Sequence, residues 1–224
     1  MKDSENKKKR WANYNYDYAI DHQKKEPEKW WEFNEIFALY EPKKNENVLE
    51  IGCNTGEFCF LLKKKFNVDP TGIDINEDAI TLAKKQYPDI NFEVRNFKEV
   101  SGNYDVIYML HLIEHLEDPL SNIIELNRLL KKNGKIIIVC PNKWAYILKF
   151  ICLMQRTKFC YDPTHLFEFS PLSLKNLILS AGYKKIKIHT KPLGVPYISR
   201  FSNNLYYNFP SSFIGGHIFA LVEK

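Results

Sequence analysis

The sequence lacks the features of a membrane-spanning or exported protein. No stretch of its 224 residues approaches the roughly 18 to 20 uncharged apolar residues that a helix needs to cross a bilayer. Its amino terminus, MKDSENKKKR, has no apolar run of the kind found in signal peptides. The five cysteines are odd in number and include no C-x-x-C pair, which is typical of reduced thiols. These absences predict a cytoplasmic protein.

The composition is that of a globular protein with an unevenly distributed charge. Hydrophobic residues make up 45% of the chain and aromatic residues 14%, which is enough to bury one core. The formal net charge is +5, but from Pro141 onward there are 11 Lys and Arg against 3 Asp and Glu. This basic last third indicates either an anionic ligand or a solvated basic face.

From Asn47 onward, apolar runs of strand length alternate with amphipathic runs of helix length. Helices are expected over residues 56–66 and 76–87, the second with Asn76 as its N-cap. The alternation predicts a βαβ series with a parallel sheet. The expected strands are NVLEIG (47–52), PTGIDI (70–75), NFEVRN (91–96), YDVIYML (104–110), KIIIVCP (135–141), KKIKIHT (184–190) and HIFALVEK (217–224).

Two later helices are marked by capping residues. The first is expected to begin at Asp118 and Pro119, to carry the apolar stripe LSNIIELNRLLKK and to end at Gly134. The second, SPLSLKNLILSAG (170–182), has the same order of a polar cap, a proline and a closing glycine.

The segments outside the alternation are expected to form additions to one core domain. The stretch KWAYILKFICLMQRTKFCY (143–161) is apolar with basic ends, so it suits a lid, a cover for a lipid-like ligand or a contact with a membrane surface. The predicted parts are a basic flexible tail (1–10), a helical cap (11–46) and a core domain (47–224) with lid insertions at 144–169 and 192–216.

The stretch VLEIGCNTGEF joins a buried strand to a helix through a glycine turn. In open α/β sheets such turns lie at the carboxyl ends of the strands, where ligands bind. The turn reads Glu50-x-Gly52-x-Asn54-x-Gly56, whereas a dinucleotide site usually has G-x-G-x-x-G facing a pyrophosphate. The acidic residue suits a cationic ligand instead. Asp74 ends the next strand, 22 positions beyond Gly52, where it is placed to accept hydrogen bonds from both ribose hydroxyls of a nucleoside.

With these motifs the sequence resembles the class I S-adenosylmethionine-dependent methyltransferases. Four motifs occur in order, LEIGCNTG, GIDI, NYDVIYMLHLIEHLEDP and RLLKKNGKIIIVCPN, and the match covers about residues 47–142 and the later SPLSLKNLILSAGY stretch. The sequence resembles most the branch that contains ubiquinone-biosynthesis O-methyltransferases and methyltransferases of surface-glycan pathways. The resemblance implies an α/β fold: a Rossmann-like, doubly wound, mostly parallel seven-stranded sheet with an antiparallel last strand, N-terminal helices and lid insertions.

The resemblance also implies S-adenosylmethionine as the cofactor and S-adenosylhomocysteine as the product. Gly52, Asn54 and Gly56 would lie beside the methionyl part, and Asp74 would hold the ribose. Asn54 stands where the family has its middle glycine. The replacement is tolerable because Asn accepts left-handed backbone conformations better than most residues. Asn96 stands where the family often has an aspartate for the adenine amino group. The full predicted cofactor set is Glu50, Gly52, Cys53, Asn54, Gly56, Asp74, Ile75, Asn96 and Phe97 beside the adenine, and Leu110 closing the site.

Residues 111–115 read HLIEH, which matches the helical H-x-x-E-H motif of one class of zinc peptidases. They directly follow an expected strand and precede the helix start at Asp118, which leaves room for only a turn of irregular helix and disfavours a peptidase. Methyltransferases of small-RNA 3′ ends and of the ubiquinone pathway have a similar E-x-x-E-H stretch that binds a divalent ion. Here His111 replaces the first glutamate, and HLFEFSP would add His165.

The resemblance leaves two roles open for the set His111, Glu114, His115 and His165. One is a divalent metal site, which with three imidazoles suits zinc better than magnesium. The other, which we favour, is a metal-free acceptor pocket. Methyl transfer is an in-line displacement that needs mainly alignment, but a hydroxyl acceptor also needs a base. His115 is the first candidate for that base and His165 the second, whereas His111 is expected to contact the cofactor.

The predicted function is methyl transfer from S-adenosylmethionine to a hydroxyl of a small molecule, or of a glycan or lipid-linked precursor, neutral or anionic. An RNA methyltransferase and a non-catalytic cofactor-binding partner subunit are the alternatives. The basic last third and the KKKR tail favour RNA, although the sequence contains no recognisable RNA-binding module. A nicotinamide dehydrogenase is a further alternative.

Overall fold

The computed structural model describes residues 31–143, 164–191 and 215–224. The chain divides into two compact units: the first runs to Met109 and includes Arg128–Lys135, and the second contains Leu110–Asn127 and the residues from Ile136 on. The predicted basic tail, most of the helical cap and most of the two insertions lie outside the described residues.

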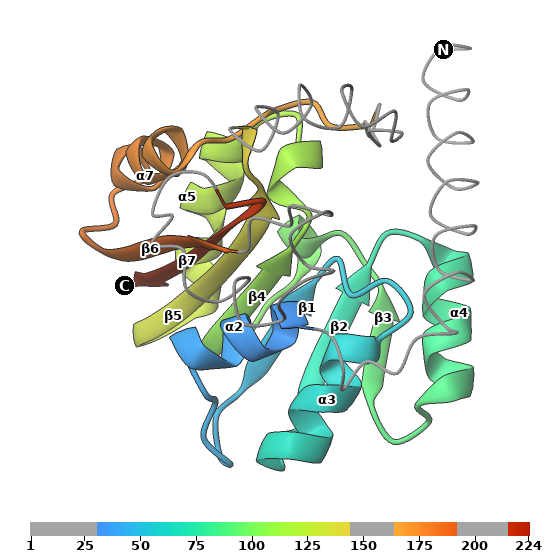
Figure 1. Ribbon diagram of the computed structural model, residues 1–224. Helices are drawn as coiled ribbons and strands as arrows, with labels where there is room; N and C mark the ends of the chain where they lie inside the picture. The colour runs from blue at the N-terminus through green and yellow to red at the C-terminus, as the bar shows by residue number, and fades with distance from the viewer. Residues whose placement is uncertain (1–30, 144–163, 192–214) are drawn as a thin grey trace, which may run out of the picture. The chain divides into compact units, whose positions relative to one another are not determined.

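The first unit is built on parallel strands that alternate with helices. β1 pairs in parallel with β2 and β4, and β2 pairs in parallel with β3. In Figure 1, β1, β2 and β3 lie side by side with α3 and α4 alongside. Its elements are α2 (Trp31–Leu39), β1 (Val48–Ile51), α3 (Glu57–Phe66), β2 (Pro70–Asp74), α4 (Glu77–Gln86), β3 (Asn91–Val94), the 3₁₀ helix η2 (Phe97–Glu99) and β4 (Tyr104–Leu110) up to Met109.

The second unit contains the antiparallel part of the sheet. β6 (Lys185–Lys191) pairs antiparallel with β7 (His217–Glu223), and α7 (Pro171–Ser180) packs on β6. The 3₁₀ helix η3 (Ile113–His115) also belongs here, as do most of α5 (Pro119–Leu129) and the second half of β5 (Leu130–Pro141). No helix within the described ranges is long and apolar enough to cross a membrane.

The strands form one seven-stranded sheet in the order β3-β2-β1-β4-β5-β7-β6. This order confirms the predicted Rossmann-like, mostly parallel sheet with an antiparallel last strand. The strand order reverses between the neighbouring parallel strands β1 and β4. In α/β sheets, ligands bind at such a point, at the carboxyl ends of the strands.

Polar side chains cap the helices where the sequence predicted them. Asn76 Oδ1 accepts from two backbone N–H groups at the start of α4 (3.0 and 3.3 Å), and Asp118 Oδ1 accepts from one at the start of α5 (3.0 Å). Ser170 Oγ accepts from the backbone N–H of Ser173 (3.1 Å), whose hydroxyl in turn accepts from the Ser170 backbone N–H (2.8 Å). Each bond satisfies a donor that would otherwise lack a partner in the first helical turn.

The end of α5 differs from the prediction. The apolar stripe predicted a helix through Lys132 closed by Gly134, but α5 ends at Leu129 and β5 begins at Leu130. Tertiary contacts override the helical pattern: Leu130 is buried, and Lys131 Nζ bonds Asp105 Oδ2 at 2.6 Å. This Lys131 contact also lowers the pKa of Asp105, against the opposing effect of its burial.

Candidate functional site

The glycine turn after β1 has the backbone that a close ligand contact needs. Gly52, Asn54 and Gly56 alternate along the turn, and all three have positive φ (77°, 47° and 86°). The backbone N–H groups of Gly52 and Cys53 donate to Ile73 O at 2.8 and 3.0 Å, which fixes the turn to the end of β2. Asn54 adopts the left-handed conformation that Asn accepts more readily than most residues.

Phe92 on β3 explains why two positions in this region are glycine. A Cβ at Gly56 would lie 2.8 Å from Phe92 Cε1, and a Cβ at Gly72 would lie 2.7 Å from Phe92 Cδ1. Contacts this short do not occur in folded proteins, so any larger residue would displace the ring. Phe92 belongs to an apolar cluster that also buries the Cys53 side chain, so Cys53 can offer a ligand only its backbone.

Three carboxyl groups surround the turn. Glu50 is 3% exposed, and its Oε2 accepts from the Cys59 thiol at 2.9 Å. Glu57, which the sequence analysis missed, is also buried, and the Thr55 hydroxyl lies 2.6 and 2.7 Å from its two carboxylate oxygens. With Asp74 these groups form an acidic site that suits a cation.

Burial changes the ionisation of two of these carboxyls. Desolvation raises the pKa of Glu50 from 4.5 to about 8, the Cys59 hydrogen bond lowers it, and the nearby charges of Glu57 and Asp74 add to the rise. Desolvation also raises the pKa of Asp74, against the effect of its backbone hydrogen bonds. A bound cation would reverse this trend, because an opposite charge favours the ionised form.

Asp74 organises the turn as well as offering oxygens to a ligand. Its Oδ2 accepts from the Asn54 backbone N–H at 3.0 Å, and its Oδ1 accepts from the Asn76 backbone N–H at 2.9 Å. Each carboxylate oxygen has a second lone pair. Asn54 Oδ1 is buried with no hydrogen-bond partner among the described residues. The turn therefore has acceptors to spare, which fits the amino and hydroxyl donors of S-adenosylmethionine.

The predicted adenine side lies next to Asp74 along β2 and after β3. Ile75 is 77% exposed, an apolar side chain available to cover a ring. Asn96 uses its Oδ1 to cap η2 by accepting from the Lys98 backbone N–H at 3.1 Å, and Phe97 is buried. Leu110, the last residue of β4, belongs to the second unit.

The HLIEH stretch does not form the single helix of a zinc peptidase. His111 has a left-handed backbone (φ 49°), and only Ile113–His115 form the short 3₁₀ helix η3. The backbone O of Glu114 accepts from the N–H groups of Leu166 and Phe167 at 2.8 and 3.0 Å. These bonds join η3 to the segment that contains His165.

Three of the four predicted catalytic residues come together in the second unit. Ligand atoms of Glu114, His115 and His165 all lie within 4.8 Å of one another, and the two imidazole centroids are 4.8 Å apart. Glu114 is 1% exposed, and neither of its carboxylate oxygens has a hydrogen-bond partner in the described part of the chain. His111 is adjacent, with its Nδ1 at 3.6 Å from Glu114 Oε1.

Thr164 orients the imidazole of His115. His115 Nδ1 lies 3.3 Å from both the backbone O and the hydroxyl of Thr164. The carbonyl oxygen only accepts, so in the tautomer that bonds it Nδ1 carries the proton and Nε2 keeps its lone pair, whereas the hydroxyl can bond either tautomer. In the tautomer with Nδ1 protonated, Nε2 is the atom that can take a proton or bind a metal ion.

The fold and the acidic glycine turn define a class of protein, the class I S-adenosylmethionine-dependent methyltransferases. Residues 22–188 match a family described as a methyltransferase domain. This is well over half of the chain, so the chain belongs to that family. Methyltransferases of this class use S-adenosylmethionine as their cofactor.

Relatives of the chain methylate or alkylate different acceptors. The chain is 28% identical to an ajmaline N-methyltransferase of Rauvolfia serpentina over 43% of this chain and 36% of that protein. It is 25% identical to a ubiquinone biosynthesis O-methyltransferase of Hydrogenovibrio crunogenus over 66% of each. It is also 25% identical to a tRNA U34 carboxymethyltransferase of Aliarcobacter butzleri over 70% of this chain and 55% of that protein. The chain thus spans a third to two thirds of these relatives.

Solved structures share the fold. An S-adenosylmethionine-dependent methyltransferase from Archaeoglobus fulgidus superposes with a TM-score of 0.66 at 21% identity, covering 93% of this chain and all of that chain. A phosphoethanolamine N-methyltransferase of Haemonchus contortus in complex with S-adenosyl-L-methionine gives a TM-score of 0.62 at 14% identity, covering 87% and 52%.

Proposed function

We propose that the protein transfers the methyl group of S-adenosylmethionine to a hydroxyl oxygen of a small molecule, or of a glycan or lipid-linked precursor, in the cytoplasm. The observation that carries the proposal is the pairing of His115 with Thr164 next to the buried Glu114 carboxylate. A hydroxyl must lose its proton during transfer, whereas an amine can react through a free electron pair. An oriented base therefore favours oxygen as the methylated atom.

The chain's own groups divide the work between binding and proton transfer. S-adenosylmethionine, when bound, supplies a methyl carbon activated by a positive sulfur. Glu50, Glu57 and Asp74 offer the negative charge that holds such a cation, and Gly52 and Gly56 allow close approach of the backbone. The binding energy is used for alignment, which is the main requirement of a displacement at carbon.

His115 takes the acceptor proton on Nε2 while Nδ1–H donates to Thr164 O. The buried Glu114 side chain lies beside His115, with ligand atoms of the two residues within 4.8 Å of each other. His165 is the second histidine that can accept or relay this proton.

The test incubates the purified protein and radiolabelled S-adenosylmethionine with cell extract separated into RNA, lipid, polysaccharide and small-molecule fractions. We expect base-stable label in the small-molecule, polysaccharide or lipid fraction, since an ether carbon is not released by mild alkali. Label confined to RNA would replace the proposal with the RNA function. Binding of S-adenosylhomocysteine without label in any fraction would replace it with a non-catalytic partner subunit.

RNA is the second candidate acceptor because of β6. Lys185, Lys187 and Lys191 occupy alternate positions of this strand, so they share one face, and all three are exposed. The similarity to a tRNA-modifying relative points the same way. If RNA is the acceptor, its apparent affinity should fall steeply between 50 and 200 mM salt, as expected for roughly three phosphate contacts; a neutral acceptor should show no such dependence.

Binding a metal ion is a second role open to Glu114, His115 and His165. The Glu114 carboxyl group fits such a site, because it is buried and neither of its oxygens has a hydrogen-bond partner among the described residues. Two imidazoles and one carboxylate suit zinc, which would lower the pKa of a bound hydroxyl. We expect the metal-free role, so activity should survive chelation by EDTA followed by gel filtration. Loss of activity on stripping, restored by zinc, would assign the metal role instead.

A further inference from the structure

Arg128 lies in the last turn of α5. Its side chain nevertheless binds the loop that follows β3, about 30 positions earlier in the chain. We call residues 95–100 the adenine-side loop. The Arg128 guanidinium donates to three of its backbone carbonyls: those of Lys98 (2.7 Å), Phe97 (3.3 Å) and Val100. Arg128 and the loop belong to the same compact unit.

The loop has few bonds of its own to hold its shape. Asn96 caps η2, and the backbone N–H groups of Glu99 and Val100 donate to Asn96 O and Phe97 O at 2.9 and 3.2 Å. Phe97 O therefore has a partner within the loop, whereas a 3₁₀ helix of three residues leaves its last carbonyls without partners inside the helix. A guanidinium presents five donors in a fixed fork, so one arginine can serve several such carbonyls at once.

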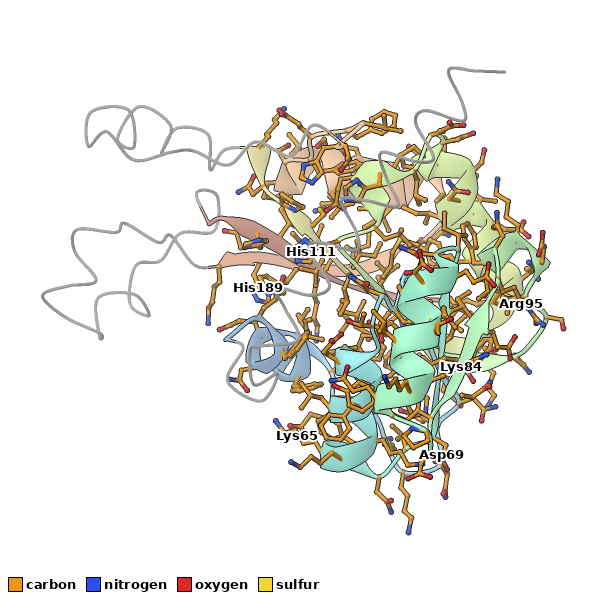
Figure 2. The ribbon with its side chains drawn as sticks, turned by 90° about the vertical axis from the view of Figure 1, so that its right-hand side faces the viewer. Lys65, Asp69, Lys84, Arg95, His111 and His189 are labelled. Atoms are coloured by element: carbon orange, nitrogen blue, oxygen red, sulfur yellow. The ribbon has the colours of Figure 1, made fainter. Side chains whose placement is uncertain are left out.

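The loop is attached directly to the groups that define the cofactor site. The backbone N–H of Arg95 donates to the backbone O of Asp74 at 2.9 Å, and Figure 2 shows Arg95 at the carboxyl end of the first unit's strands, opposite the end where Asp69 lies. Asn96 and Phe97, the residues expected beside the adenine, follow at once. The position of the loop therefore decides where the adenine can bind.

We propose that Arg128 is a positioning residue for the cofactor: by holding three carbonyls of the adenine-side loop, it keeps the loop in its adenine-binding conformation. It acts through the loop and takes no part in methyl transfer itself. The inference rests on the proposed function only in that the bound molecule is S-adenosylmethionine or its product.

Two simpler roles for Arg128 make different predictions. If it only stabilises the fold, its loss lowers the melting temperature and leaves the affinity of the folded protein unchanged. If its positive charge acts at a distance, its loss should strengthen binding of the cationic S-adenosylmethionine relative to the neutral S-adenosylhomocysteine. Positioning predicts weaker binding of both by the same factor.

The experiment compares Arg128→Met with Lys132→Met, which removes a positive charge from an exposed residue four positions away. Calorimetric titration should give a dissociation constant for S-adenosylhomocysteine about tenfold higher in Arg128→Met, as expected if the binding conformation falls to about a tenth of the population. The Lys132→Met value should match the wild type. Arg128→Lys should lie between, because an ammonium group lacks the fork geometry.

Two further readouts separate positioning from loss of stability. Hydrogen exchange of the adenine-side loop amides should speed up in Arg128→Met while exchange in β1 stays unchanged. Once an acceptor is known, KM for S-adenosylmethionine should rise about tenfold with kcat within twofold of the wild type.

The outcomes distinguish this inference from the proposed function. Unchanged affinity of Arg128→Met for both ligands, or an equal loss in Lys132→Met, would overturn the positioning role while leaving the methyltransferase assignment intact. If the wild-type protein binds neither ligand, the proposed function itself fails.

Discussion

Replacing His115 with glutamine is expected to lower kcat for methyl transfer about 100- to 10,000-fold, the usual range for loss of a general base. Glutamine keeps a donor for Thr164 O but has no nitrogen lone pair that can take a proton at neutral pH. The affinity for S-adenosylhomocysteine should not change, because the turn that we propose to bind it is built from Glu50, Asp74 and their neighbours. The measurement is kcat and KM with the identified acceptor, together with a cofactor titration.

His189→Gln provides the matched control. His189 lies on β6, where its ring stacks on Phe219 with centroids 5.3 Å apart, and it is labelled separately from His111 in Figure 2. We expect wild-type kcat for this variant and a smaller loss for His165→Gln than for His115→Gln. Retention of kcat within threefold by His115→Gln would rule out His115 as the base and point to an acceptor that needs none.

The backbone of the glycine turn could be predicted largely from the sequence because its constraints are local. A buried strand, a turn that requires left-handed backbone and a helix start follow one another within a dozen residues, and Asn54 takes the conformation that its side chain allows. The same holds for the caps: Asn76 and Ser170 stand immediately before their helices and bond backbone groups within three residues.

The contacts that set the charge of this site could not be predicted in the same way. The thiol of Cys59 reaches Glu50 from the next helix, and Thr55 holds Glu57 in a buried position. No spacing rule specifies the Cys59–Glu50 pair, since it depends on how α3 packs against β1. The aromatic ring over Gly56 and Gly72 likewise comes from another strand.

The histidine cluster was predicted in composition but not in geometry. The sequence grouped four residues, and the structure brings Glu114, His115 and His165 together with His111 at their side. Thr164 could not be predicted because it reaches His115 from 49 positions along the chain, through both its carbonyl and its hydroxyl. Only the fold shows which carbonyl faces an imidazole.

Replacing Glu50 with glutamine is expected to weaken cofactor binding and to stabilise the ligand-free protein at alkaline pH. Loss of a charged hydrogen-bonding group should raise the dissociation constant for S-adenosylhomocysteine about 10- to 100-fold. Glutamine has nearly the same shape and can still accept from the Cys59 thiol through its amide oxygen. The two effects have opposite signs because the same burial that suits a bound cation penalises the empty carboxylate.

The pH dependence of stability follows from the raised pKa of Glu50, about 8 in the folded chain against 4.5 for an ordinary glutamate. Between these values the folded protein holds a proton that the unfolded chain has lost. The contribution is therefore fully present below pH 4.5 and is lost as the pH rises through about 8, by at most roughly 1.4 kcal/mol per pH unit. The raised pKa of Asp74 also lowers the free energy of unfolding as the pH rises, and this contribution remains in Glu50→Gln.

Urea unfolding of both proteins at pH 5, 6, 7 and 8 measures this effect. The free energy of unfolding of the wild type should fall faster with pH than that of Glu50→Gln, so that the variant is the more stable protein at pH 8. Saturating S-adenosylhomocysteine should reverse the order, because only the wild type has a carboxylate to pair with the ligand's ammonium group. Parallel pH curves for the two proteins would mean that Glu50 is already ionised in the empty site. In that case burial does not raise the pKa of Glu50 enough to matter, and any remaining fall of stability with pH comes from the raised pKa of Asp74.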